Sequence, residues 1–229
     1  MCTVTLIRKP HGMCITMNRD EKRTRGHERP PEVLESSSVI APCDVDGGGT
    51  WIGLSPSGYW ACLLNRYESF QPAENPPSRG RIIPEILSTM SPVNTLLTMD
   101  VTRYRPFSIL IGDAASVDIF HWNGERLIIE EKPVHEDVMI SSSSWDAENV
   151  IAARMAAFEQ WKGQGRLSDA EGIPLIHRWQ ESGESTSGIL MSRDESRTTS
   201  ITQIAFFHDD VPKMRYWPAS ELQPFSMRE

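Results

Sequence analysis

Two short segments near the start of the chain predict a β-hairpin. Residues 3–9 and 13–19 are rich in Thr, Val and Ile, and a Pro-His-Gly segment lies between them, which is typical of two strands joined by a turn. Side-chain alternation sets the register, because a slip of one residue exchanges the two faces of a strand. The register with Val4 opposite Met17 keeps apolar residues on one face and threonines on the other. We therefore expect an antiparallel hairpin in this register.

That register places Cys2 opposite Arg19, with Cβ atoms about 5 Å apart, and puts Asp20 beside the chain terminus. Removal of Met1 would give Cys2 a free α-amine with a reference pKa of about 7.7–8.0, close to the thiol value of about 8.5. One residue would then hold a nucleophile and its own base. A neighbouring guanidinium favours the thiolate, and a carboxylate can orient the amine. The alternative is that residues 18–21 (Asn-Arg-Asp-Glu) are only a charged strand end.

The composition is ordinary for a globular chain and argues against several classes of function. Of the 229 residues, 39% are hydrophobic and 24% are charged, which is sufficient for a single domain over residues 1–229. The net charge of −8 argues against a nucleic-acid partner, which requires clustered Lys and Arg. No apolar run approaches the roughly 20 residues of a membrane span, and the first residues lack the pattern of a signal peptide. We therefore expect a cytoplasmic protein.

The cysteines and histidines predict neither a disulfide framework nor a metal centre. Cys2, Cys14, Cys43 and Cys62 are irregularly spaced and include no C-x-x-C pair, which is typical of reduced thiols. The six histidines form no H-E-x-x-H or comparable pattern, so no metal is expected. We expect no cofactor, and the sequence indicates no oligomeric state.

The longest helix is expected over residues 145–162. Ser144 is its predicted N-cap, and Ile151, Met155 and Phe158 form the predicted apolar stripe. A helix with one apolar face is what a layer packed against a sheet requires.

The other segments mix strands, helices and loops, which predicts an α+β class. Residues 21–38 are charged, contain Pro and lack periodicity, so we expect a long loop there. The segment MSRDE at 191–195 resembles MNRDE at 17–21, but nothing around the two copies is similar, and we interpret the echo as coincidence. The remaining predictions are short helices over 81–89 and 173–179 and strands over 50–54, 107–112, 116–122, 126–130, 186–192, 198–207 and 213–217.

Several motifs follow one another in an order that resembles the NRDE family, whose eukaryotic branch is named for transport and Golgi organization. The two most specific in combination are NRDE at 18–21 and GGTWIG at 48–53. The others are MC at 1–2, ACLLNR at 61–66, SRG at 78–80, YRPF at 104–107 and IGD at 111–113. The resemblance covers most of the chain.

That family is similar to the cysteine branch of the N-terminal nucleophile hydrolases, which includes cholylglycine hydrolase and penicillin V acylase. The resemblance implies a four-layer αββα sandwich with mainly antiparallel sheets. It also implies catalytic roles for four residues: Cys2 as nucleophile, Arg19 and Asp20 in support of it, and Asn65 in the oxyanion hole. The relatives' second oxyanion asparagine has no assigned counterpart here.

Two functions follow from these expectations. The first is an amidohydrolase that cleaves a linear or acyl amide, a small-molecule substrate, through Cys2 after Met1 is removed. The second is a non-catalytic protein on the same scaffold that binds or transports lipid or haem, because a fold does not dictate function.

Overall fold

The computed structural model describes residues 1–35, 37–68, 70, 75–130, 136–165, 173–180, 187–207 and 210–224. Two compact units account for the chain: Met1–Arg25 with Asp137–Glu229, and Gly26–Glu136. Each unit contains one sheet, and all strand pairings between the described strands are antiparallel. The predicted α+β class with mainly antiparallel sheets is confirmed.

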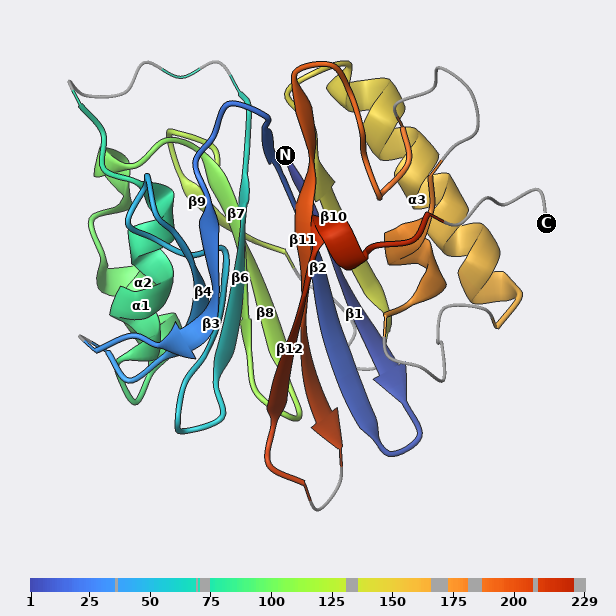
Figure 1. Cartoon of the computed structure of the whole chain (residues 1–229). Coiled ribbons are helices and arrows are strands. Elements are labelled where there is room, and N and C mark those ends of the chain that lie inside the picture. The colour runs from blue at the N-terminus through green and yellow to red at the C-terminus, as the bar shows by residue number, and fades with distance from the viewer. Residues whose placement is uncertain are drawn as a thin grey trace. The chain divides into compact units, whose positions relative to one another are not determined.

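The first unit is built on a five-stranded sheet in the order β10-β1-β2-β11-β12 (Figure 1). The central hairpin of β1 and β2 therefore has a neighbour on both sides, which satisfies its backbone hydrogen-bonding groups. The strands are β1 (Cys2–Lys9), β2 (Gly12–Lys22), β10 (Val138–Ser142), β11 (Ser196–Phe207) and β12 (Lys213–Pro218).

The predicted register of the hairpin is confirmed. Val4 pairs with Met17, and Cys2 pairs with Arg19. Because alternate residues point to opposite faces, Cys2 and Val4 share one face, and Thr3 lies on the other.

The long helix α3 (Ala147–Gly163) packs on one face of this sheet (Figure 1). Arg154 of α3 donates to the Thr3 hydroxyl, so this is the face that carries Thr3. Its apolar contacts form a core with the sheet and with the short helix η3 (Leu175–Arg178). The members of that core are Ile7, Met139, Ala157, Phe158, Trp161, Ile176, Trp179 and Ile189.

The predicted N-cap of this helix is wrong, and its predicted apolar stripe is confirmed in part. The N-cap is Asp146, in a left-handed conformation and without a side-chain cap, and not Ser144. The buried residues are Val150, Arg154, Ala157, Phe158 and Trp161. Phe158 of the predicted stripe is therefore confirmed, and Met155 is half-buried and packs against the same core, whereas Ile151 is only half-buried. The reason is that Arg154 lies at the centre of the buried face, and a search for apolar residues does not identify a buried arginine.

The second unit is built on a seven-stranded sheet in the order β3-β4-β5-β6-β7-β8-β9. Helix α1 (Ile82–Leu87) buries its isoleucines in an apolar core with β6 and β7. The strands are β3 (Glu28–Val33), β4 (Ile40–Asp44), β5 (Ile52–Leu54), β6 (Trp60–Asn65), β7 (Phe107–Gly112), β8 (Val117–Trp122) and β9 (Leu127–Glu130). The remaining helices are η1 (Arg79–Arg81), α2 (Pro92–Thr98) and η2 (Val101–Arg103).

The predicted long loop over residues 21–38 is wrong, because β3 lies within it. Strand β3 contains two consecutive prolines, and its register against β4 shifts between Arg29 and Glu32. Proline removes a ladder donor and is found mostly on edge strands, and β3 is the edge strand of its sheet.

The other predicted segments are confirmed except for one. The described residues from 187 to 192 of the predicted 186–192 strand contain only one isolated bridge, Ser192 to Arg197; residue 186 lies outside the described residues. Among the described residues, no helix has both the length and the apolar character that a bilayer crossing requires.

Candidate active site

Cys2 begins strand β1 and lies directly opposite Arg19 on β2. Its backbone nitrogen donates a hydrogen bond to Ser142 Oγ at 3.1 Å, and the residue is 8% exposed. The nitrogen that would become the α-amine after loss of Met1 is therefore already held by a hydroxyl group. Ser142 ends β10, a strand that the sequence pattern did not predict.

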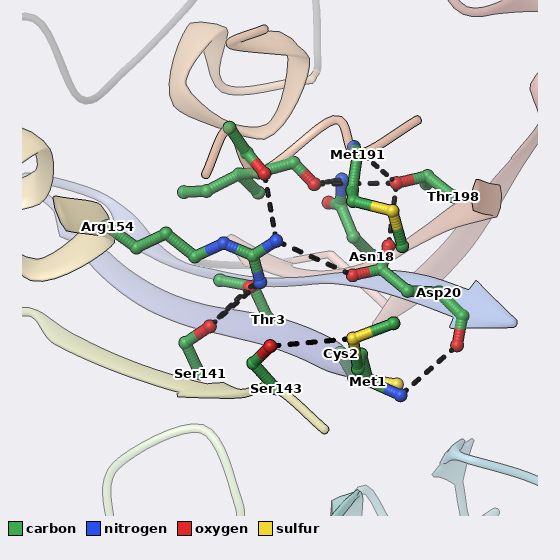
Figure 2. Close-up of polar contacts among 12 residues, drawn as sticks. Met1, Cys2, Thr3, Asn18, Asp20, Ser141, Ser143, Arg154, Met191 and Thr198 are labelled. Atoms are coloured by element: carbon green, nitrogen blue, oxygen red, sulfur yellow. Dashed lines mark hydrogen bonds and ion pairs between the residues drawn. The ribbon is translucent and has the colours of Figure 1, made fainter. Parts of the chain in front are cut away.

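Met1 extends the β1–β2 pairing by one residue. The Asp20 backbone N–H donates to the Met1 carbonyl at 3.0 Å, and the Met1 ammonium donates to the Asp20 carbonyl at 3.3 Å (Figure 2). The main chain of Asp20 thus fixes the position of the residue that precedes Cys2.

Burial raises the pKa of the Cys2 thiol above its ordinary value. The positive charge of the chain terminus is the largest effect that opposes this rise in pKa. The Asp20 carboxylate raises the pKa of the thiol further. A hydrogen bond from the Asp20 backbone and the charge of Arg19 also lower the pKa of the thiol, by less. With Met1 in place the thiol is therefore neutral at ordinary pH, and its activation requires a proton acceptor beside it.

The Asp20 side chain lies on the sheet face that carries α3. Thr198 Oγ1 donates to Asp20 Oδ1 at 2.6 Å, and Arg154 Nη2 lies 3.8 Å from Asp20 Oδ2 in an ion pair whose side chains are fully buried (Figure 2). Burial raises the pKa of Asp20, and the charge of Arg154 is the largest effect that opposes the rise. The predicted role of Asp20 at the α-amine stays a prediction, since Thr198 and Arg154 are the partners of its carboxylate here.

Arg154 is the main residue of this site that sequence reasoning missed. Its guanidinium donates to the Ser187 and Gly188 carbonyls at 3.0 and 2.8 Å, and to the hydroxyls of Thr3 and Ser141 at 2.9 and 3.0 Å. One side chain of α3 thus connects β1, β10 and the segment before β11. No local signal marks an arginine in a helix as buried.

Arg19 is nearly buried, with 5% of its surface exposed. Its guanidinium donates to Thr199 Oγ1 at 3.2 Å and forms an ion pair with Glu21 at 3.4 Å. These two contacts hold the cation on the face that it shares with Cys2.

Asn65 is the last residue of β6, in the second unit, and is half-buried. It pairs with Phe107 of β7. Its predicted oxyanion role stays a prediction.

Asn18 and His177 form a buried polar cluster on the α3 face of the sheet. Asn18 Oδ1 lies 2.6 Å from His177 Nδ1, and Asn18 Nδ2 donates to the His177 and Ile189 carbonyls. Because an amide oxygen only accepts, Nδ1 carries the proton of a neutral imidazole, and Nε2 accepts from the Thr5 hydroxyl at 2.7 Å. The first residue of the NRDE motif therefore has a structural partner.

Acidification is expected to destabilise the protein through His177. Burial lowers the pKa of His177 from 6.5 to about 3, so the unfolded chain takes up a proton that the folded chain refuses. This contribution to stability is complete above pH 6.5 and is lost as the pH falls towards 3, by up to about 1.4 kcal/mol per pH unit. Urea unfolding between pH 7 and pH 4 measures it.

The matched variant is His177→Gln, which keeps hydrogen-bonding capacity and does not titrate. Asp20 contributes a slope of opposite sign, since its pKa is raised by burial, so the difference between wild type and variant isolates the histidine. An equal slope in His177→Gln would show that His177 is not the cause.

A cavity of about 730 Å³ lies in the second unit. Its lining includes two arginines and two glutamates, Arg29, Arg81, Glu32 and Glu35, together with uncharged residues, and it includes none of the four predicted site residues. Within the described ranges, no group of three or more His, Cys, Asp or Glu side chains has an arrangement suited to a metal ion.

The sequence matches one known protein family over most of its length. A family model described as Transport and Golgi organisation 2 matches residues 1–172. A search of curated protein sequences finds no match.

Solved structures of two amide hydrolases are similar to the chain. The Caenorhabditis elegans orthologue of N-acylethanolamine-hydrolyzing acid amidase aligns with a TM-score of 0.56 and 10% identity, over 89% of this chain and 92% of that one. A cysteine-to-alanine mutant of the conjugated bile acid hydrolase of Clostridium perfringens aligns with a TM-score of 0.50 and 10% identity, over 96% and 93%. These likenesses confirm the predicted N-terminal nucleophile hydrolase type of fold.

Proposed function

The chain belongs to the Transport and Golgi organisation 2 family, and from that premise we propose that it is an N-terminal cysteine amidohydrolase. It cleaves a linear or acyl amide through a thioester on Cys2 after Met1 has been removed. The solved structures most relevant to this proposal are named for hydrolysis of N-acylethanolamines and of conjugated bile acids, both of which contain an amide. We also propose a cytoplasmic location, which is supported by widely spaced cysteines that form no disulfide among the described residues.

The position of the Cys2 nitrogen is the observation that carries the proposal. This nitrogen already has a hydrogen-bond partner in Ser142, and Arg19 lies directly across the strand pair. Loss of Met1 would convert the same nitrogen from an amide into a primary amine without any change in the strand. A base would then lie on the nucleophile's own residue, which the raised pKa of the buried thiol requires.

The reaction proceeds in two halves. The α-amine takes the thiol proton, the thiolate attacks the amide carbonyl carbon, and the resulting α-ammonium gives its proton to the leaving nitrogen as the C–N bond breaks. Water then attacks the thioester, with the α-amine as base, and the carboxylic acid and the free thiol are released. Arg19 favours the thiolate, and Asn65 is the proposed oxyanion donor, whose loss typically costs about 3–4 kcal/mol of barrier.

Covalent labelling tests the nucleophile. Intact-mass measurement is expected to show that Met1 is absent, because the second residue is small. A thiol-directed acyl probe is expected to add one mass increment at Cys2, and Cys2→Ala should lose this labelling together with amide turnover. Cys14→Ala, which removes a buried thiol of the same hairpin, is the matched control and should keep both.

Two results would contradict the proposal. One is protein that retains Met1 and turns over the amide as fast as protein that begins at Cys2, and the other is turnover that survives in Cys2→Ala. Haem or lipid binding that depends on Cys2, without amide turnover, would instead favour the non-catalytic alternative.

A further inference from the structure

The Met1 side chain lies beside the Cys2 nitrogen and is in contact with polar side chains. Its thioether sulfur lies 3.2 Å from Arg193 Nη1 and 3.6 Å from Ser143 Oγ. The Arg193 guanidinium in turn lies over the indole of Trp145, 4.8 Å from the ring centroid. Met1 itself is half-buried. The residue that the proposed mechanism discards therefore fills a space that has a cation, an aromatic wall and a hydroxyl.

The chemistry of the proposed reaction gives that space a role. The α-amine must protonate the leaving nitrogen, so the leaving group lies within about 3 Å of the Cys2 nitrogen. Met1 is attached to that same nitrogen, and its side chain extends from it to Arg193. The space that Met1 vacates is thus on the leaving-group side of the scissile bond.

The acceptor that Met1 offers to Arg193 Nη1 is a weak one. A thioether sulfur accepts hydrogen bonds weakly, whereas a guanidinium binds a carboxylate through two parallel hydrogen bonds. The Ser143 hydroxyl has a nearer acceptor in the Trp145 carbonyl at 2.5 Å, so Ser143 shapes the wall and Arg193 supplies the charge. Stacking on Trp145 holds the plane of the guanidinium.

Arg193 retains its charge in this setting. Burial lowers its pKa, the carboxylates of Asp20 and Asp146 oppose that lowering, and a guanidinium stays protonated in proteins. Asp20 has Arg154 and Thr198 as its own partners, and Asp146 accepts from Asn149.

We propose that Arg193, Trp145 and Ser143 form a leaving-group subsite that selects amides whose amine portion carries a carboxylate, as in an N-acyl amino acid. This inference rests on the proposed amidohydrolase function and adds its substrate class. It also gives a role to the MSRDE segment at 191–195, which contains Arg193.

Two substrates that differ only in the leaving amine test the subsite. N-hexanoylglycine carries a carboxylate, and N-hexanoylethanolamine carries a hydroxyl in its place. Protein that begins at Cys2 is expected to hydrolyse the glycine conjugate with a kcat/KM about 10- to 100-fold higher, which is the range for one charge-assisted interaction. Arg193→Met should remove this preference, because it should lower the rate with the glycine conjugate far more than the rate with the ethanolamide. Arg215→Met, an exposed arginine on β12, should leave both rates unchanged.

Binding to the Cys2→Ala protein separates the subsite from the chemistry. Calorimetric titration is expected to show tighter binding of N-hexanoylglycine than of the ethanolamide, and Arg193→Met in this background should equalise the two. Equal affinities before the Arg193 substitution would overturn the subsite even if hydrolysis occurs. An Arg193-dependent preference without hydrolysis by the Cys2 protein would reject the amidohydrolase and leave the anion subsite standing.

Discussion

Protein that retains Met1 is expected to hydrolyse its amide substrate about 10³-fold more slowly than protein that begins at Cys2, within the range that a general base contributes. Met1 converts the Cys2 nitrogen into an amide, which cannot take the thiol proton. The thiol then has no base on its own residue, while burial still raises its pKa. Met1 also fills the space beside Arg193 that the leaving group requires.

Two preparations that differ only in Met1 measure this effect. A cleavable N-terminal fusion can be cut before Met1 or before Cys2, and steady-state rates are compared with one substrate. Removal of Met1 deletes two hydrogen bonds to the Asp20 main chain, from Asp20 N–H to the Met1 carbonyl and from the Met1 ammonium to the Asp20 carbonyl, so the unfolding free energy should change by only about 2 kcal/mol. Equal turnover by the two forms would rule out the α-amine as the base and with it the proposed mechanism.

The hairpin and its register could be predicted because they are encoded locally. Alternation of apolar residues with threonines fixes which faces match, and the pairing of Cys2 with Arg19 follows from counting along two strands. The family motifs then extended this local result to the fold. The hydrogen bond from the Cys2 nitrogen to Ser142 could not be predicted. Strand β10 begins far along the chain at Val138, and its sequence has no strong strand pattern.

The buried position of Arg154 could not be predicted for a different reason. Helix patterns assign charged residues to solvent, but Arg154 is fully buried. Its burial depends on carbonyl groups at 187 and 188 and on hydroxyls of two strands. These acceptors converge only after the fold forms, so sequence spacing contains no trace of them. The same holds for Arg193, whose neighbours Met1 and Trp145 are distant in sequence.

Replacement of Arg154 by Met is expected to lower the free energy of unfolding by about 3–5 kcal/mol, the usual cost of removing one partner of a buried ion pair. The change leaves the Asp20 carboxylate buried without its cation. It also leaves the Ser187 and Gly188 carbonyls without the donors that the guanidinium supplies. Urea unfolding at pH 7 measures the loss, and Lys162→Met, at a half-buried position in the last turn of the same helix, should stay within about 0.5 kcal/mol.

A double-mutant cycle with Asp20→Asn identifies the cause. If the stranded carboxylate dominates the loss, Asp20→Asn should recover part of it in the Arg154→Met background, while the same change alone destabilises the protein by stranding the guanidinium. The coupling energy should then be of the order of 1–3 kcal/mol, as for residues in one polar network. Additive losses would instead assign the role of Arg154 to its hydrogen bonds with β1, β10 and the segment before β11. In that case Asp20 would depend on Thr198 alone, and its carboxylate would be freer to turn towards the α-amine than the ion pair allows.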